Sequence, residues 1–388
     1  MAQQDNAPMD VNQPQPLLAG LSPAQFMRRH WQKRPLWVRQ GIPGVVSPVT
    51  RAEMFALAAR DDVESRLVRR DARDRWKLRH GPLLRRALPP LAQPGWTLLV
   101  QGLDLHADAA HELLSRFRFV PAARLDDLML SYASDGGGVG PHVDSYDVFL
   151  LQVSGRRQWR IGRAGRAVLR DDVPLKMLAS FAIEQEAILE PGDMLYLPPG
   201  WAHEGTAVGS DCMTASVGFR TPGIDELAQA LLGRLADDLH DDDPATPLRP
   251  YRDPAQPATD APGAVPPALQ QFARQTLARA LGDPRLLERA LGEWLTEPKA
   301  QVWFDALPDA TPIVGGAVRL DRRTRMAYDA HHVFINGESL RAAGRDARLM
   351  RELADRRQLV DRAVRHASPA ARGQLCEWLA NGWLHVHD

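Results

Sequence analysis

Apolar residues recur along this chain with two different periods, and the change of period divides the chain into regions. From Trp96 to about residue 220, short apolar runs alternate with turn-forming residues, which is typical of β-strands. The expected strands are TLLVQGL, DDLMLSYAS, SYDVFLLQV, RRQWRIG, EAILE, MLYL and CMTASVGF, with turns at Ser154-Gly155 and Gly209-Ser210-Asp211 among others. Because little helical pattern lies between most of these runs, neighbouring strands should pair antiparallel in a β-barrel or jelly roll.

The pattern becomes helical after Thr221. Leucines recur at about one-turn spacing through IDELAQALLGRLADDLH, at Leu227, Leu231, Leu235 and Leu239. A second pair of helices is expected in ALQQFARQTLARAL and PRLLERALGEWLT, after a proline-rich exposed connection over 241–267. The leucine stripe would leave an apolar face uncovered, which favours a homodimer. Packing of the same stripe against the barrel is the alternative.

The two ends of the chain differ from its centre. The first residues are polar and proline-bearing, which predicts a flexible tail over 1–20, and Ser22 followed by Pro23 predicts the start of the first helix. Near the other end, two strands are expected in AVRLD and HVFIN, then helices in RDARLMRELADRR and AARGQLCEWLAN, then an extended WLHVH. A β-hairpin combined with helices in this order indicates a winged-helix-like module.

We therefore expect four regions. These are the tail (1–20), a main domain (21–220) whose β core spans about 96–220, a helical dimerisation region (221–298) and the winged-helix-like module (299–388). At 388 residues the chain is longer than one hydrophobic core usually supports, which agrees with several units.

Composition and charge exclude several classes of protein. The 48 basic and 48 acidic residues cancel, so the whole chain has no attraction to nucleic acid or to an anionic membrane. Cys212 and Cys376 match no disulfide framework and no zinc-ligand spacing. The N-terminus has no signal-peptide pattern, and no apolar stretch is long enough to span a bilayer. We expect a cytoplasmic protein.

Two short motifs together suggest a metal site. In GGGVGPHVDSYDVF, His142 and Asp144 are two residues apart at a strand start, so both can face one ion from the same side. About sixty residues later, EPGDMLYLPPGWAH ends in His203. An HxD pair alone is a weak signal, but two imidazoles and one carboxylate that leave coordination positions open are the ligand set of non-haem Fe(II) oxygenases.

The charge of such a site favours an anionic cosubstrate. One aspartate leaves Fe(II) with a net positive charge, which suits the keto-acid end of 2-oxoglutarate. The distal carboxylate of 2-oxoglutarate then needs a buried cation, and the strand RRQWRIG offers Arg156, Arg157 and Arg160. Arg156 and Arg157 are neighbours on one strand and cannot both face inward.

The motifs resemble those of a known family, the Jumonji-C (JmjC) branch of the 2-oxoglutarate oxygenases, in its bacterial ribosomal-oxygenase form. The resemblance extends from QKRPLWVR through GGGVGPHVDSYDVFLLQVSGRRQWRIG and EPGDMLYLPPGWAHEG into the C-terminal regions, and the last two motifs are specific. It implies a double-stranded β-helix of the JmjC/cupin type. It also implies that His142, Asp144 and His203 hold iron, that Arg157 binds the distal carboxylate of 2-oxoglutarate, and that Ser131 is a polar contact to the same molecule.

The substrate expected from this resemblance is a ribosomal protein. Lysine commonly fills the cosubstrate position in the wider family, so arginine there favours the ribosomal group over the histone demethylases. The resemblance implies hydroxylation of an arginine at its β-carbon in ribosomal protein sixteen of the large subunit. A cationic substrate needs acidic partners, for which Asp126, Asp127, Asp135 and Asp147 are candidates. Alternatives are another protein, tRNA or small-molecule substrate, or a non-enzymatic metal-binding cupin regulator.

The C-terminal module raises the question of DNA binding, because winged helices often bind DNA. Its arginines are interleaved with acidic residues such as Asp321, Glu338 and Asp346, so no clean basic face is predicted. Nucleic acid is therefore not the expected partner. Support of the ribosomal protein substrate or of a dimer is the expected role.

Overall fold

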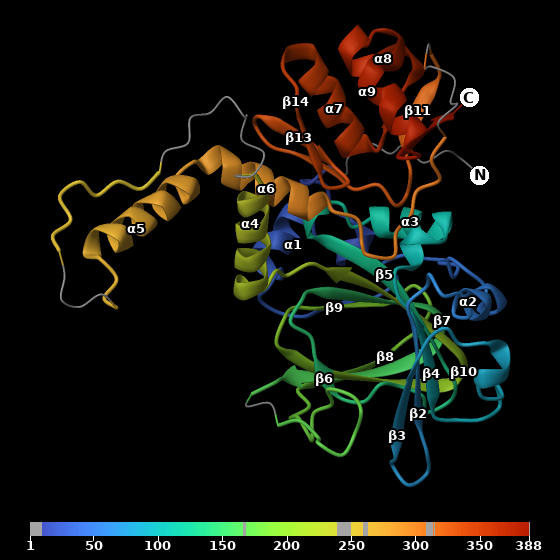
Figure 1. Ribbon diagram of the computed structural model, residues 1–388. Coiled ribbons are helices and arrows are strands. Elements are labelled where there is room, and N and C mark those ends of the chain that lie inside the picture. The colour runs from blue at the N-terminus through green and yellow to red at the C-terminus, as the bar shows by residue number, and fades with distance from the viewer. Residues whose placement is uncertain are drawn as a thin grey trace.

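The structure is a computed structural model that describes residues 10–165, 168–238, 250–258, 263–307, 313 and 315–387. Figure 1 shows a β-sheet domain, a C-terminal module on top of it, and helix α5 projecting to one side. In the described part of the chain, no helix is long and apolar enough to cross a membrane.

The first elements show that the predicted tail is too long. A 3-10 turn, η1 (Pro16–Leu18), buries Leu17 and Leu18 in the main core, so the chain is already ordered before residue 20. Helix α1 (Pro23–Arg29) then begins where it was predicted. The Ser22 hydroxyl accepts from the backbone N–H of Gln25, whose side chain accepts from the backbone N–H of Ser22, which makes a complete capping box.

The main sheet has ten strands, all paired antiparallel as expected. They are β1 (Leu36–Val38), β2 (Ser65–Arg70), β3 (Trp76–His80), β4 (Trp96–Val100), β5 (Leu125–Ala133), β6 (His142–Val143), β7 (Val148–Arg163), β8 (Gln185–Leu189), β9 (Met194–Leu197) and β10 (Trp201–Phe219). Their order is β1-β9-β7-β10-β5-β4-β2-β3, with β6 also on β10 and β8 also on β7. Strands β2 and β3 were not predicted, because their half-polar sequence lacks an apolar run.

Two expected turns lie inside strands. Ser154-Gly155 does not end a strand, because it lies within β7, which is 16 residues long. Gly209-Ser210-Asp211 forms an irregularity within the 19-residue β10, where the pairing register with β7 shifts between Val208 and Met213. Gly155 takes a φ of +62° opposite this irregularity, where an added Cβ would come within 3 Å of the β10 backbone. Two long strands, β7 and β10, thus replace the three short ones SYDVFLLQV, RRQWRIG and CMTASVGF.

The two largest apolar cores lie in different parts of the chain. The first lies within the sheet domain, where aromatic rings of Phe26, Phe149, Tyr196 and Phe219 contact one another and helices α2 (Arg51–Leu57) and α3 (Asp108–Ser115) cover it. The second lies in the C-terminal module. Short 3-10 turns η2 (Arg85–Ala87), η3 (Leu103–Leu105) and η4 (Ala122–Arg124) complete the first domain.

The helical region has the predicted helices α4 (Ile224–Asp238), α5 (Pro267–Leu281) and α6 (Pro284–Thr296). The leucine stripe of α4 packs on α6, with Leu235 buried and Leu227 and Leu231 half-buried. Leu239 lies outside the described residues, as does much of the expected connection over 241–267. Helix α5 differs: all its described side chains are exposed, and it stands away from the body of the molecule (Figure 1).

The C-terminal module contains the predicted strands and helices with shorter elements between them. It comprises β11 (Ala317–Leu320), β12 (Met326–Tyr328), β13 (His332–Ile335), β14 (Glu338–Arg341), α7 (Gly344–Arg356), β15 (Gln358–Leu359), α8 (Asp361–Arg365), α9 (Pro369–Ala380) and β16 (Leu384–His387). Two three-stranded sheets, β15-β11-β16 and β12-β13-β14, flank these helices.

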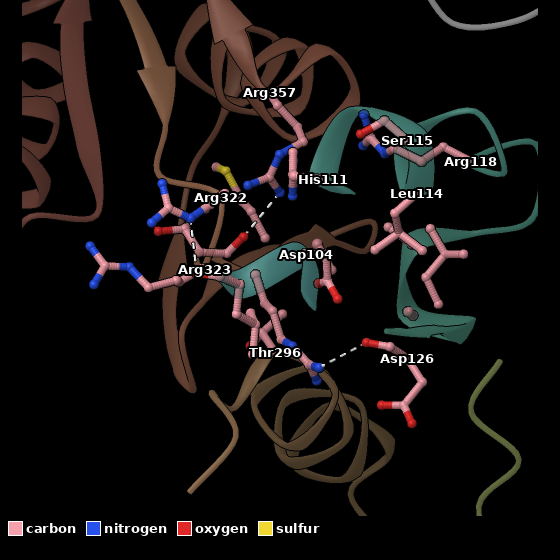
Figure 2. A pocket seen from close by; sticks show the side chains of 18 of the residues that line it. Asp104, His111, Leu114, Ser115, Arg118, Asp126, Thr296, Arg322, Arg323 and Arg357 are labelled. Carbon is pink, nitrogen blue, oxygen red and sulfur yellow. Dashed lines mark hydrogen bonds between the residues drawn. The ribbon is translucent and has the colours of Figure 1, made fainter. Parts of the chain in front are cut away.

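Arginines join this module to the sheet domain along what we call the domain seam, formed by η3, α3 and η4 on one side and residues 321–327 with Arg357 on the other (Figure 2). Arg118 donates to the carbonyls of Ala354 and Asp355, at 2.9 and 2.8 Å. From the module, Arg322 donates to the Leu105 carbonyl and to Asp108. Burial and the neighbouring arginines lower the pKa of Arg357 to about 9.

The burial of η1 gives a stability prediction. Leu18 has no exposed surface, so Leu18→Ala should lower the free energy of unfolding by about 2–5 kcal/mol, through lost burial and the cavity left behind. Val11 is 47% exposed, and Val11→Ala should change it by less than about 0.5 kcal/mol. Urea denaturation of both variants measures this. Equal, small effects would mean that residues 10–20 do not pack on the core.

Candidate metal centre

Three side chains converge at the mouth of the sheet domain. His142, Asp144 and His203 each offer one ligand atom, and these atoms lie within 4.8 Å of one another. Nε2 of His142 is 4.0 Å from Asp144 Oδ1, and Nε2 of His203 is 3.6 Å from Asp144 Oδ2. The structure therefore brings together the three residues that the two motifs suggested.

Strand pairing produces this arrangement. Strand β6 pairs with the start of β10, which places His142 directly opposite His203. Asp144 follows β6, and its carbonyl accepts a hydrogen bond from the N–H of Gly200 in the turn that leads into β10. Each imidazole is oriented by its own backbone: Nδ1 of His142 lies 3.0 Å from the Gly140 carbonyl, and Nδ1 of His203 lies 3.1 Å from the Trp201 carbonyl.

These contacts suit metal ligation. A ring whose Nδ1 donates to a carbonyl has an unprotonated Nε2, and in both histidines Nε2 is the atom that faces Asp144. Burial and the nearby His142 lower the pKa of His203 well below its usual range, so its ring is neutral. Burial raises the pKa of Asp144, although His142 opposes that change. Two imidazoles whose Nε2 atoms face one carboxylate fit a divalent cation.

The glycine-rich segment before His142 has a packing role. Its backbone exchanges hydrogen bonds with Ala207 of β10 through Gly136 and Gly137. A Cβ on Gly138 would lie 2.5 Å from the Gly205 carbonyl, so only glycine permits this close approach. The segment thus holds His142 against β10.

A cavity of about 380 Å³ opens beside the triad, and Arg157 lines it from β7. Arg157 is 4% exposed, and its Nη1 donates to the Gly205 carbonyl at 3.5 Å. Its Nε and Nη2 are buried and have no hydrogen-bond partner among the described residues. Of the other two arginines considered, Arg156 is exposed and Arg160 pairs with Glu186 and Glu204 outside the cavity. A buried guanidinium with two unpaired N–H groups fits a small carboxylate.

The remaining predicted residues divide between the cavity and the core. Ser131 lines the cavity, and its hydroxyl donates to the Thr214 carbonyl at 3.3 Å. Asp126 and Asp127 also line it. Asp135 instead accepts from the Gly209 N–H in the β10 irregularity, and fully buried Asp147 accepts from Tyr196 and Gln32. Asp135 and Asp147 are therefore structural.

Several residues of the cavity were not predicted. They include Arg66, Gln101, Met129, Tyr146, Trp159 and Ser216. Tyr146 stands inside the HVDSYDVF motif and could have been considered, because it follows the metal-ligand pair directly. The others come from β2, β4, β5, β7 and β10, and no local pattern marks them.

Comparisons with known proteins agree with this geometry. Residues 112–227 match the JmjC domain, and residues 279–385 match the ROXA-like winged helix. The ribosomal protein uL16 3-hydroxylase of Escherichia coli (strain K12) is 34% identical over 294 residues, which are 74% of this chain and 74% of that protein. This chain belongs to the JmjC ribosomal oxygenases.

Solved structures of the family extend the match to nearly the whole chain. The crystal structure of E. coli YcfD has a TM-score of 0.83 at 29% identity and covers 94% of this chain and 98% of its own. YcfD in complex with cobalt and 2-oxoglutarate has a TM-score of 0.79 at 29% identity, covering 95% and 99%. A probable ribosomal oxygenase of Haemophilus influenzae is 35% identical over 54% of this chain and 52% of its own length.

Membership settles several expectations. The JmjC antiparallel β core and the C-terminal winged helix are confirmed, and the chain is a 2-oxoglutarate-dependent oxygenase. A non-enzymatic cupin regulator, the alternative from another class, is therefore excluded.

Proposed function

We propose that this oxygenase uses Fe(II) to hydroxylate an arginine of the large-subunit ribosomal protein uL16. The observation that carries the proposal is one cavity with three sets of groups: the His142, Asp144 and His203 triad, the unpaired guanidinium of Arg157, and the acidic pair Asp126 and Asp127. A metal, an anionic cosubstrate and a cationic substrate side chain each find complementary groups there. The name of the E. coli relative supports uL16 and the 3-position.

His142, Asp144 and His203 would hold the metal and leave part of its coordination sphere open. When bound, Fe(II) supplies the activation of O₂, which no protein side chain can perform. In the overall reaction, 2-oxoglutarate loses CO₂ and becomes succinate with one oxygen atom of O₂, while the other atom enters a substrate C–H bond. The protein binds and orients the reactants in a pocket largely closed to water.

Arg157 would bind the distal carboxylate of 2-oxoglutarate, since its Nε and Nη2 are buried cationic donors that no described residue engages. Ser131 lies on β5 next to Thr214, so its hydroxyl can turn from the Thr214 carbonyl to the same cosubstrate. Arg157 and Ser131 would thus bind 2-oxoglutarate, and Asp126 and Asp127 remain to bind the cationic side chain of the substrate.

We further propose that the enzyme is a homodimer through its helical region, 221–298, and that its β core is a double-stranded β-helix. On helix α5 the apolar side chains of Leu269, Phe272 and Leu277 remain 38%, 36% and 63% exposed, although the ring of Phe272 contacts that of Tyr251. A second copy of the chain would cover them. A ribosomal protein substrate is found in the cytoplasm, so we infer that the enzyme acts there.

Hydroxylation is tested by mass spectrometry of a uL16 peptide incubated with the enzyme, Fe(II), 2-oxoglutarate and O₂. We expect one arginine to gain one oxygen atom, and His142→Ala and Asp144→Ala to lose this activity by at least about 10³-fold because the metal is no longer held. His331→Ala, which changes a histidine far from the triad, should keep it. Unmodified uL16 with a metal-loaded wild-type enzyme, or turnover on tRNA or a small molecule instead, would contradict the uL16 proposal.

Arg157 is tested by 2-oxoglutarate binding. Arg157→Met removes the buried cation, and we expect the dissociation constant to rise by about 100-fold, equivalent to about 2.7 kcal/mol. Arg156→Met provides the matched control, because Arg156 is the neighbouring side chain on the outer face of β7. Calorimetric titration with a redox-inert metal in the site measures both. Equal affinities in the two variants would remove Arg157 from the cosubstrate site.

The dimer is tested by sedimentation equilibrium. Phe272→Glu with Leu277→Glu places charges on the apolar side of α5, and we expect dimerisation to weaken by at least about 100-fold because those charges would be buried. Gln271→Glu, on the same exposed helix, should leave it unchanged. A monomeric wild-type enzyme at micromolar concentration would contradict the proposal.

A further inference from the structure

A β-bulge places two acidic residues side by side at the inner end of the cavity. In the pairing of β5 with β10, Asp127 lies opposite Gly218 but Leu125 lies opposite Phe219, so Asp126 is an extra residue on β5. Consecutive strand residues normally point to opposite faces. The bulge instead lets the carboxylates of Asp126 and Asp127 both reach one cation.

That cation is Lys299, from the segment that joins α6 to the winged helix. Its Nζ lies 3.1 Å from Asp126 Oδ1 and 3.4 Å from Asp127 Oδ2. The chain has four lysines, Lys33, Lys77, Lys176 and Lys299, so the other 44 of its 48 basic residues are arginines. Lysine at this position presents a compact charge that two carboxylates can share from one side.

Lys299 stands behind the carboxylates and not in the catalytic cavity. It lines an adjoining cavity, which shares Gln101 with the catalytic cavity. Asp127 Oδ2 also accepts from Gln101 Nε2 at 2.6 Å and from the N–H of Gly102 at 2.9 Å. Among the described residues, no hydrogen bond engages Asp126 Oδ2 or Asp127 Oδ1. One oxygen of each carboxylate is thus held from behind, and the other is free for a ligand.

The neighbourhood is too acidic to be stable without this lysine. Asp104 is 5% exposed, and burial together with the charge of Asp127 raises the pKa of Asp104 to about 7. Burial alone would lower the pKa of Lys299, but the charges of Asp127, Asp126 and Asp104 raise it. Arg220 adds a weaker cation, with Nε 3.7 Å from Asp126 Oδ1. Removing Lys299 would leave three crowded carboxylates with little compensation.

Arg323, on the domain seam, donates to the Trp303 carbonyl in the segment that carries Lys299. Arg322 ties the module to the Leu105 carbonyl, and Arg325 donates to the carbonyl of Asp126 itself at 3.5 Å. Figure 2 shows Asp104, Asp126 and Thr296 together at this seam. The C-terminal part of the chain therefore reaches the acidic pair from two directions.

We propose that Lys299 is a positioning residue that keeps Asp126 and Asp127 ionised and oriented toward the cavity, so that the pair takes one cationic substrate side chain. The proposal rests on the proposed function, in which that side chain is an arginine. A guanidinium would bind the two free oxygens in front while Lys299 binds the other two behind. The winged-helix region then acts in substrate selection through this lysine.

The test is the pH dependence of KM for the uL16 peptide in the wild type, Lys299→Met, Lys299→Arg and the surface control Lys77→Met. Without Lys299, one carboxyl of the pair takes up a proton as the pH falls, and the guanidinium must displace that proton to bind. We expect the ratio of the Lys299→Met KM to the wild-type KM to rise at least about fivefold from pH 8 to pH 6, with the kcat ratio within about twofold. Lys299→Arg and Lys77→Met should follow the wild type.

The ratio of each variant's KM to the wild-type KM removes the effect of groups that titrate in every variant. The charged and titratable groups around the pair include Lys299, Asp104, Arg220, Arg66, Arg325, Tyr146, Glu226 and Glu297. A pH-independent KM ratio for Lys299→Met would overturn the proposal. So would a Lys299→Arg variant that behaves like Lys299→Met.

Thermal unfolding gives a readout that needs no substrate. The carboxyl groups left behind by Lys299→Met have a raised pKa in the folded state, so their cost appears as the pH rises and they ionise. The loss of Tm relative to the wild type should therefore be larger at pH 8 than at pH 6. An equal loss at both pH values would also overturn the proposal. If the wild-type enzyme does not hydroxylate the peptide but Lys299→Met still shows this pH-dependent loss of Tm, only the uL16 substrate is refuted.

Discussion

The site depends on the uninterrupted length of β10. This strand pairs with β6, β7 and β5, so residues far apart in the sequence are fixed in register around one cavity. His203 lies opposite His142 on β6, Ala207 lies opposite Arg157 on β7, and Thr214 lies opposite Ser131 on β5. A register slip of one residue would turn each of these side chains to the other face. Pairing with β7 stops after Val208, where the register shifts, and resumes at Met213.

The same pairing maintains groups that are costly without ligands. Arg157 is a buried cation whose Nε and Nη2 are unpaired among the described residues, and Asp144 is a carboxylate close to the neutral ring of His203. Each arrangement loses solvation that the protein itself does not replace. The apolar core around Phe26, Phe149 and Tyr196 provides the stability that offsets this cost, and bound metal and cosubstrate would return part of it.

The sequence predicted what is encoded locally and missed what depends on three dimensions. The alternation of strands, the helix start at Ser22-Pro23 and the His142 and Asp144 spacing are local, and the structure contains all three. The turns predicted at 154–155 and 209–211 were wrong because glycine and aspartate occur in β-bulges as well as in turns. The neighbouring strands determine which of the two forms. The tail prediction failed because Leu17 and Leu18 are too few to form a pattern, although the core can still bury them.

The choice among the acidic candidates shows why the rest needed the structure. The sequence does not distinguish the four aspartates Asp126, Asp127, Asp135 and Asp147. In the structure, the bulge on β5 turns the first two toward the cavity. The other two stabilise a strand irregularity and the core. The contact of Lys299 with these carboxylates could not be predicted either, because Lys299 lies more than 170 residues from Asp126 and Asp127 in the sequence.

The domain seam gives the winged helix a role that its fold alone does not suggest. A winged helix that bound nucleic acid would keep its arginines free on one face. Here Arg322 and Arg325 donate to backbone carbonyls of the sheet domain, Arg323 is paired with Asp321, and Arg357 donates to carbonyls within its own module. Arg322 and Arg325 thus join the two domains, and Arg323 and Arg357 are engaged within the module. The module is therefore directed inward, toward the carboxylates that close the cavity, and its effect on catalysis passes through the position of the segment that carries Lys299.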